Sequence, residues 1–426
     1  MAPPPPPKKL VLAASSADAG VAAWDLRTGA EDIRLRPCAS RPRALASVGD
    51  RFLAAAQAPP PGGNSGTIHF YHWDKPQVAV KSFPAEPIHV LIADPEGTYL
   101  IGGGGKGNIY LWEVASGELL YTWHAHYRTV RCLALYDYLL VSGSEDGSIR
   151  VWDLITMLDE QSRLEANTSY LYSFSQHALP VTDIACFLGG IVVSSSEDRT
   201  CKIWSLSEGR ILRSVLFPAI IDSVALDPRS HIFYAGGRDG KIYVTAMGVD
   251  VNSHSSDDSS ILGALDDHSK AVTSLAASSD GLLLVSGSED GNVRVWDTRS
   301  QQVTRKFKHS QGPVTNVLIV TPKRINLPPL QSLRKVCSAH GEGEVRAVIL
   351  PRPESDVPVA GNSSSIFLER CLDALQHGDS SRPFESGLST LYSAPNQQGA
   401  EWRSRYLELQ DLFVHEVLDQ MPSRGA

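Results

Sequence analysis

A short segment that recurs along the chain constrains its fold more than any other feature. Three copies are nearly identical: VSGSEDGSIRVWD (141–153), VSSSEDRTCKIWS (193–205) and VSGSEDGNVRVWD (285–297). Each contains an apolar stretch, a polar turn and an alternating stretch with Trp near its end. Two such stretches around a tight turn are typical of a β-hairpin. The chain must therefore fold as a series of similar hairpins.

Four weaker copies extend the series to seven: AASSADAGVAAWD (13–25), GNSGTIHFYHWD (63–74), GGGGKGNIYLWE (102–113) and AGGRDGKIYVTA (235–246). The positions that match the Trp are 24, 71, 112, 152, 204, 245 and 296, so successive copies lie 40 to 52 residues apart. A period of about 40 to 45 residues that ends in Trp-Asp resembles the WD40 repeat, which forms one four-stranded blade of a β-propeller. We therefore predict an all-β fold, a seven-bladed WD40 propeller with a C-terminal α-helical extension.

The two ends of the repeat region are predicted to pair with each other. Residues 10–15 have the pattern of a middle strand, but no inner strand precedes them. After the seventh Trp, GPVTNVLIV (312–320) has the pattern of an inner strand without a hairpin to follow. We predict that this segment completes the first blade and closes the ring, which removes free sheet edges. The propeller would then span residues 10–320, after a disordered Pro/Lys segment at 1–9.

Three repeats carry a recurring set of polar residues. A His precedes the hairpin, an Asp follows a strand Ser by four residues, and a Trp follows the Asp by six. In WD40 proteins these residues form a buried hydrogen-bond chain across the blade, because a buried carboxylate needs donors. Their recurrence in register, without a GxSxG motif, argues against a hydrolase triad. The predicted sets are His126, Ser142, Asp146 and Trp152; His177, Ser194, Asp198 and Trp204; and His268, Ser286, Asp290 and Trp296.

Other repeats depart from this pattern. Lys106 occupies the Asp position of the third repeat, and Thr245 occupies the Trp position of the sixth. Ser65 and Tyr71 stand at the Asp and Trp positions of the second. We expect these blades to be stabilised by packing alone.

The residues after the propeller differ in character. Residues 321–398 are expected to form a linker with a possible short helix, and its basic stretch TPKRINLPPLQSLRKV is either solvated or in contact with RNA or an acidic partner. Residues 399–421 are predicted to form an amphipathic helix that packs on the propeller, on a second copy of the chain or on a partner. The apolar stripe of this helix contains Trp402, Tyr406, Leu409, Phe413 and Val417.

Composition excludes several classes of function. With 39 basic and 47 acidic residues the net charge is −8, which argues against duplex nucleic acid as the main ligand. The six cysteines form no CxxC pair, so we expect neither a zinc site nor a disulfide framework. The glycine-rich segment 102–107 lacks the ending of a phosphate-binding loop. We expect an intracellular protein with no membrane span, no metal and no cofactor.

Beyond the repeats, the sequence resembles one WD40 family in particular. The residues that carry the resemblance are QHALPVTDIACF (176–187), LSEGRILRSVLFPAII (206–221) and QGPVTNVLIV (311–320). They are similar to the WD40 subunit of the Rix-type pre-ribosome complex, a family with plant root-initiation-defective and animal WD repeat-containing members. The resemblance covers nearly the whole chain and is weakest between residues 351 and 396.

The resemblance implies a non-enzymatic scaffold in the nucleus. Members of this family assemble with a helical-repeat subunit, bind precursors of the large ribosomal subunit and support removal of the second internal transcribed spacer. They also recruit an AAA ATPase that remodels the particle, and plant members support meristem formation and cell proliferation. Direct contact with RNA and dimerisation through the C-terminal helix stay open.

An alternative hypothesis is a substrate receptor of a cullin ubiquitin ligase. The segments WDLR (24–27) and WDTR (296–299) match the WDxR box through which many WD40 receptors bind the adaptor of the ligase. Arg27 and Arg299 would carry that contact. An enzyme is the least favoured hypothesis, because the sequence contains no metal cluster, phosphate loop or separate acid–base group.

Overall fold

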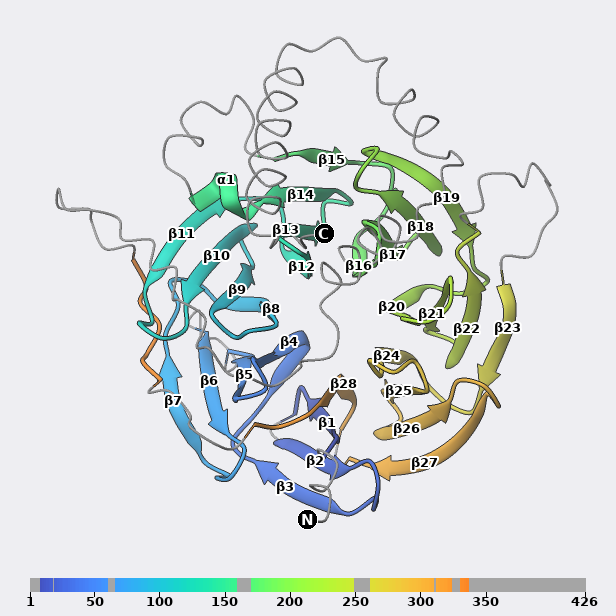
Figure 1. The fold of residues 1–426 in the computed structure, drawn as a ribbon, viewed down its shortest axis with the longest axis horizontal. Coiled ribbons are helices and arrows are strands. Elements are labelled where there is room, and N and C mark those ends of the chain that lie inside the picture. Colours follow the sequence, from blue (N-terminus) through green and yellow to red (C-terminus); the bar gives the residue numbers. More distant parts are fainter. Residues whose placement is uncertain are drawn as a thin grey trace, which may run out of the picture. The chain divides into compact units, whose positions relative to one another are not determined.

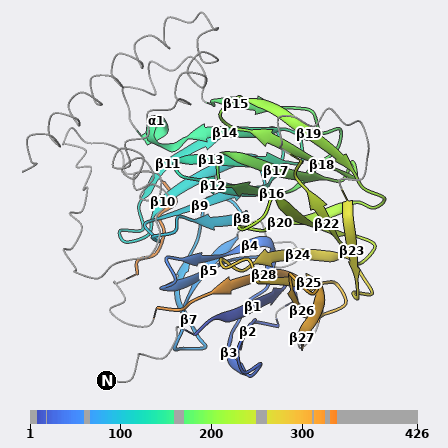
Figure 2. The same ribbon diagram turned by 45° about the vertical axis from the view of Figure 1, so that its right-hand side comes forward.

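Seven four-stranded antiparallel sheets are arranged in a ring in the computed structural model of the chain (Figure 1). The structure describes residues 8–17, 19–59, 66–158, 170–248, 261–309, 312–323 and 330–336. Within each sheet one strand lies near the axis of the ring and another lies at the rim (Figures 1 and 2). The predicted seven-bladed β-propeller is therefore confirmed.

The blades are numbered along the chain, with strands given from the axis to the rim. Blade 1 contains β28 (Val314–Val320), β1 (Leu10–Ser15), β2 (Val21–Asp25) and β3 (Glu31–Leu35). Blade 2 contains β4 (Ser40–Val48), β5 (Phe52–Gln57), β6 (Thr67–His72) and β7 (Val78–Ser82). Blade 3 contains β8 (Ile88–Ala93), β9 (Tyr99–Gly104), β10 (Asn108–Glu113) and β11 (Leu119–His124). Blade 4 contains β12 (Val130–Tyr136), β13 (Leu139–Ser144), β14 (Ile149–Asp153) and β15 (Tyr172–Phe174).

The remaining blades have the same order. Blade 5 contains β16 (Val181–Phe187), β17 (Ile191–Ser196), β18 (Thr200–Ser205) and β19 (Arg210–Leu216). Blade 6 contains β20 (Ile221–Leu226), β21 (Ile232–Gly237), β22 (Lys241–Ala246) and β23 (Ile261–Asp266). Blade 7 contains β24 (Val272–Ala277), β25 (Leu283–Ser288), β26 (Asn292–Asp297) and β27 (Gln302–Lys308). A short helix, α1 (Leu154–Leu158), follows β14.

The apolar core lies between neighbouring blades. Because each sheet is covered on both faces, side chains on both sides of the middle strands are buried, and β1 and β5 are buried along their whole length. Trp204 of blade 5 stacks on Phe174 of blade 4 with ring centroids 4.6 Å apart, in a cluster that also contains Val141. Since this apolar area is buried only where two sheets meet, each blade depends on its neighbours for stability.

The ring closes through the pairing of the first and last strands. β1 and β28 pair antiparallel, from Leu10 opposite Val320 to Ser15 opposite Val314. The predicted contribution of residues 312–320 to the first blade is therefore confirmed. Closure leaves β28 hydrogen-bonded to β1 instead of presenting a free edge.

The segment 330–336, here called the strap, packs against blades 2 and 3. Leu333 is buried in the apolar cluster of these blades beside Trp112, and its backbone N donates to Ser82 Oγ over 2.9 Å. The Trp112 indole donates to the carbonyl of Arg334 over 3.0 Å, and the Arg334 guanidinium lies 2.9 Å from Glu118. The strap belongs to the basic stretch that was expected to be solvated or to contact RNA or an acidic partner. Its described part instead packs on the ring.

Several expectations concern residues at the chain ends. Lys8 and Lys9, the described part of the segment expected to be disordered, form ion pairs with Asp32 and Asp280 at 2.5 and 2.7 Å. The predicted amphipathic helix at 399–421 and its apolar stripe lie outside the described residues, as does most of the linker. Among the helices that the structure describes, none is long and apolar enough to cross a membrane.

Candidate functional site

The polar set of blade 5 forms a continuous hydrogen-bond chain. The Trp204 indole donates to Ser194 Oγ over 2.8 Å, and the Ser194 hydroxyl lies 2.9 Å from His177 Nε2. On the other side of the imidazole, His177 Nδ1 lies 2.9 Å from Asp198 Oδ2. If Nδ1 carries the proton, the imidazole donates to Asp198 and accepts from Ser194, so each group of the chain is satisfied.

The same arrangement occurs in blades 4 and 7. In both blades His Nε2 lies 2.7 Å from the strand Ser and the Trp indole donates to that Ser over 2.8 Å. His Nδ1 lies 3.3 Å from the turn Asp in blade 4 and 3.0 Å in blade 7. The structure thus brings together all the residues named for these two sets: His126, Ser142, Asp146 and Trp152, and His268, Ser286, Asp290 and Trp296.

Hydrogen bonding and burial shift the pKa values of the ionisable residues in these sets. Burial alone would raise the pKa of Asp198, but hydrogen bonds from His177 and Thr200 hold it well below its usual range. The same competition lowers the pKa values of Asp146 and Asp290. Burial lowers the pKa values of His126 and His268, which favours neutral imidazoles beside ionised carboxylates.

These sets stabilise the blades and offer no reactive centre. Ser142, Ser194 and Ser286 are 0% exposed, so no substrate can reach their hydroxyl groups. A nucleophilic serine must be accessible and must face an oxyanion site. No group of three His, Cys, Asp or Glu side chains that could hold a metal ion occurs in the described ranges.

Blade 3 contains a polar network that the sequence analysis missed. Glu86, buried in the loop before β8, accepts from the Lys106 backbone N, from Asn108 Nδ2 and from the Tyr110 hydroxyl, each over 2.9 Å. A carboxylate from the preceding loop therefore takes the place of the missing turn Asp. The expectation that this blade relies on packing alone was wrong, because a carboxylate supplied by a different loop is not visible in the hairpin motif.

Blades 2 and 6 also contain polar contacts in place of the standard set. In blade 6 the Tyr243 hydroxyl donates to Asp239 Oδ2 over 2.5 Å. In blade 2 the buried Tyr71 hydroxyl donates to the carbonyl of Pro37, and His69 Nδ1 lies 3.3 Å from that hydroxyl. The expectation that these blades are stabilised by packing alone is therefore also wrong, because a Tyr hydroxyl donates a hydrogen bond in each of them.

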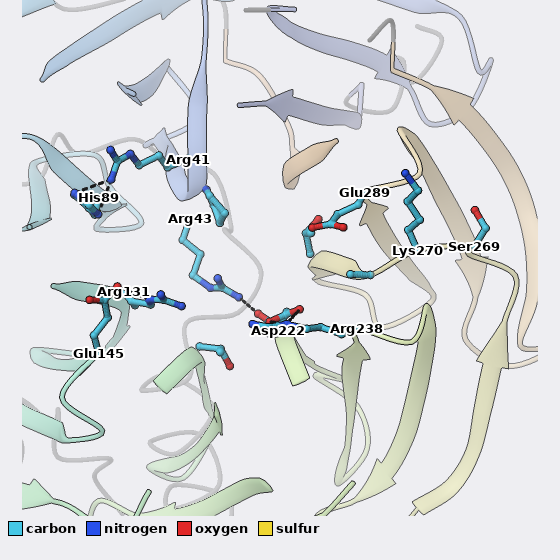
Figure 3. Close-up of a pocket in the computed structure, with 14 residues that line it drawn as sticks. Arg41, Arg43, His89, Arg131, Glu145, Asp222, Arg238, Ser269, Lys270 and Glu289 are labelled. Atoms are coloured by element: carbon cyan, nitrogen blue, oxygen red, sulfur yellow. Dashed lines mark hydrogen bonds and ion pairs between the residues drawn. The ribbon is translucent and has the colours of Figure 1, made fainter. Parts of the chain in front are cut away.

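A hollow of about 860 Å³ opens at one end of the channel along the ring axis (Figure 3). We call it the channel mouth. Polar side chains from the start of the innermost strands, from the loops before them and from hairpin turns line it; most are charged, and the set includes Arg41, Arg43, His89, Arg131, Glu145, Asp222, Arg238, Lys270 and Glu289. From the sequence, Arg131 stood out only as part of a local basic patch with Arg128 that left RNA contact open; the other residues were not singled out, because the repeats that carry them lie far apart in the chain.

Most arginines of the channel mouth are paired with carboxylates. Arg43 extends from blade 2 across the axis and donates to the carbonyl of Asp222 in blade 6 (Figure 3). Its Nε lies 2.6 Å from Asp183 of blade 5. Arg131 and Arg238 both contact Glu197, at 3.3 and 3.1 Å. Arg131 also pairs with Glu145 at 2.9 Å, and Arg238 pairs with Asp222 at 3.0 Å. These ion pairs join blades 2, 4, 5 and 6 around the channel.

Comparisons with known proteins show the family of this chain. The family model described as "WD domain, G-beta repeat" matches residues 117–153, 168–205 and 259–297. The chain is 42% identical to Protein ROOT INITIATION DEFECTIVE 3 of Arabidopsis thaliana, over 94% of this chain and 97% of that protein. The chain belongs to the ROOT INITIATION DEFECTIVE 3 family of WD40 proteins.

The chain is also similar to proteins from animals and fungi. WD repeat-containing protein 18 of Homo sapiens is 34% identical over 70% of this chain and 69% of that protein. Pre-rRNA-processing protein IPI3 of Yarrowia lipolytica is 31% identical over 64% of this chain and 66% of that protein. Relatives of this chain therefore occur in a plant, an animal and a fungus.

Proposed function

We propose that this chain is a non-enzymatic scaffold subunit of a nuclear complex that acts in large ribosomal subunit maturation and pre-rRNA spacer processing. The observation that carries the proposal is the similarity along 94% of the chain to ROOT INITIATION DEFECTIVE 3, in a family with relatives named pre-rRNA-processing proteins. The geometry supports a scaffold, because the recurring Ser, His and Asp residues form buried hydrogen bonds with one another inside the blades. In plants this role would support meristem formation and cell proliferation.

The proposed partners follow from the same resemblance. They are a helical-repeat subunit of the Rix-type complex, large-subunit pre-ribosomal particles and an AAA ATPase remodeller. A homodimer through the C-terminal helix is a further proposal. A closed ring suits this role, because both faces and the rim of a propeller are available to different partners at once.

Affinity purification of the tagged full chain from nuclear extract tests the proposal. Mass spectrometry of the eluate is expected to detect a helical-repeat protein, and hybridisation is expected to detect precursor rRNA that still contains the second internal transcribed spacer. Depletion of the protein is expected to cause that precursor to accumulate. Recovery of neither the precursor nor the helical-repeat subunit would defeat the proposal, with the tag alone as the control.

The two arginines of the WDxR segments are accessible to a ligase adaptor. Arg27 and Arg299 are both exposed and follow the equivalent strands β2 and β26 of neighbouring blades, so they lie at the same end of the ring. A ligase receptor would lose binding to the propeller adaptor when both residues are changed to Ala. Absence of adaptor binding in the unmodified chain, or unchanged binding in the double variant, would rule this function out.

A further inference from the structure

One arginine of the channel mouth differs from the others in its partners. Arg41 Nη1 lies 2.9 and 2.7 Å from the two ring nitrogens of His89, and no carboxylate of the described residues pairs with it. Figure 3 shows the Arg41 side chain turned toward His89 at the edge of the hollow, whereas Arg43 points across it. Arg41 therefore presents a positive charge without an internal counterion.

The environment of Arg41 makes that charge costly. Burial lowers the pKa of Arg41, whereas Asp183 outweighs the effect of burial and raises the pKa of Arg43. Burial, followed by the charge of Arg41, lowers the pKa of His89 to about 4, so this imidazole is neutral near pH 7 and can accept a hydrogen bond from the guanidinium without adding a second positive charge. A partly desolvated guanidinium without a counterion gains strongly from an incoming anion.

The backbone holds Arg41 in place through an unusual bulge. Between two paired positions β4 advances five residues, from Ser40 to Leu45, while β5 advances only two, from Gln57 to Ala55. The three extra residues contrast with the single extra residue in the other inner strands that start with a register shift, such as β12 and β24. Bulges re-aim side chains and are frequent beside functional sites.

The bulge contains a strained residue and is hydrogen-bonded to β28. Arg43 has a φ of 59°, in the left-handed region that a non-glycine residue seldom adopts. The buried Asn316 on β28 donates through Nδ2 to the Arg41 carbonyl over 2.7 Å, and Thr315 donates to the Ser40 carbonyl over 2.8 Å. These hydrogen bonds hold, at the channel mouth, an arginine that has no carboxylate partner among the described residues.

We propose that the channel mouth is a binding site for an acidic peptide segment of a partner, in which an anionic side chain inserted beside His89 pairs with Arg41. A carboxylate or a phosphate on a modified serine supplies the required chemistry, since both accept two parallel hydrogen bonds from a guanidinium.

Charge distribution favours a peptide over a nucleic acid strand. Glu289 lines the same hollow, and the remaining arginines are already paired with Asp183, Asp222, Glu145 and Glu197. A phosphate backbone carries closely spaced charges and would meet these carboxylates. A peptide can place one or two anionic side chains next to Arg41 and neutral residues elsewhere.

Fluorescence anisotropy with the purified full chain tests this proposal. The probes are a labelled Gly/Ser peptide with a central run of glutamates, the same peptide with phosphoserines, the same peptide with glutamines, and a single-stranded oligouridine. The glutamate or phosphoserine peptide is expected to bind more tightly than the glutamine peptide, and added salt is expected to weaken that binding. The two anionic peptides distinguish the carboxylate from the phosphate source.

Variants connect the binding to Arg41. Arg41→Glu is expected to weaken binding of the anionic peptide by at least about tenfold, while Arg210→Glu, the same change at an exposed arginine on β19, leaves it unchanged. Arg41→Gln provides a neutral variant should the charge reversal prevent folding, and thermal unfolding checks each protein. Asn316→Ala, which releases the bulge, is expected to weaken binding to a smaller degree.

Three results would overturn the proposal: equal binding of the glutamate, phosphoserine and glutamine peptides, anionic binding that is unchanged in Arg41→Gln, or tighter Arg41-dependent binding of the oligouridine. The last result would assign the site to RNA. Because the assay contains only the purified chain and peptides, its failure leaves the proposed role in ribosome maturation standing.

Discussion

Single hydroxyl groups connect the strands of three blades. Ser194 Oγ accepts from the Trp204 indole and lies within hydrogen-bond distance of His177, and all three side chains are buried. Removal of such a hydroxyl leaves two buried polar groups without a partner, and water cannot replace it in a close-packed core.

Ser194→Ala is therefore expected to lower the free energy of unfolding by about 1–3 kcal/mol. Chemical denaturation monitored by Trp fluorescence measures the change. Ser173→Ala, at an exposed position on β15, is the matched control and should have almost no effect. Equal stability of the Ser194 variant and the control would show that the hydrogen-bond chain contributes little.

Protonation of the same sets predicts an acid-sensitive ring. The folded-state pKa values of His126 and His268 are lowered, so the unfolded chain binds more protons and stability falls as the pH drops below about 6.5. The pKa values of Asp146, Asp198 and Asp290 are also lowered, so their contribution, present above pH of about 4, is lost on further acidification. Urea unfolding from pH 8 to pH 3 measures this profile.

His126→Gln is expected to flatten the slope of this profile between about pH 7 and pH 5. His231→Gln, at an exposed histidine just before β21, is expected to preserve it. A slope that is unchanged in His126→Gln would contradict the assignment to the buried imidazole.

At the scale of elements, the strap compensates for a blade that lacks a standard residue. Gly102 of β9 stands where blades 4, 5 and 7 have the strand Ser, and a Cβ at this position would lie 2.9 Å from the Trp112 ring. The Trp112 indole therefore has no hydroxyl to donate to in its own blade and donates to the Arg334 carbonyl instead. Blade 3 thus depends on a segment far away in sequence.

Leu333→Asp is expected to release the strap, because a charge cannot be buried in the apolar cluster of blades 2 and 3. Limited proteolysis with trypsin should then cleave after Arg334 and Lys335 several times faster, and the melting temperature should fall. Val336→Asp, at a residue that is 74% exposed, is the control and should leave both unchanged. Equal cleavage rates in the two variants would mean that Leu333 does not hold the strap.

At the scale of the whole ring, the blades are held together by contacts between residues distant in sequence. β1 pairs with β28, and Arg43 of blade 2 reaches Asp183 of blade 5 across the axis. Because each blade buries its apolar faces against two neighbours, an open ring would expose a sheet face as well as a strand edge.

Deletion of residues 1–15, which removes β1, is expected to produce aggregates through the exposed edges of β2 and β28. Size-exclusion chromatography with light scattering measures the outcome. Deletion of residues 1–7 is the control and should give the same size as the full chain. A non-aggregating 1–15 variant with a cooperative thermal transition would show that closure is dispensable.

The hairpin repeats determined the blade number, the closing strand and the His, Ser, Asp and Trp sets, because these features depend on short spacings that recur along the chain. The tertiary structure alone decided the Glu86 network, the position of the strap and the contact of Arg41 with His89 at the channel mouth. Each of these depends on a contact between segments that the hairpin motif does not connect. Local periodicity specifies a strand and its faces, but the partner of a side chain across the ring is set only when the ring closes.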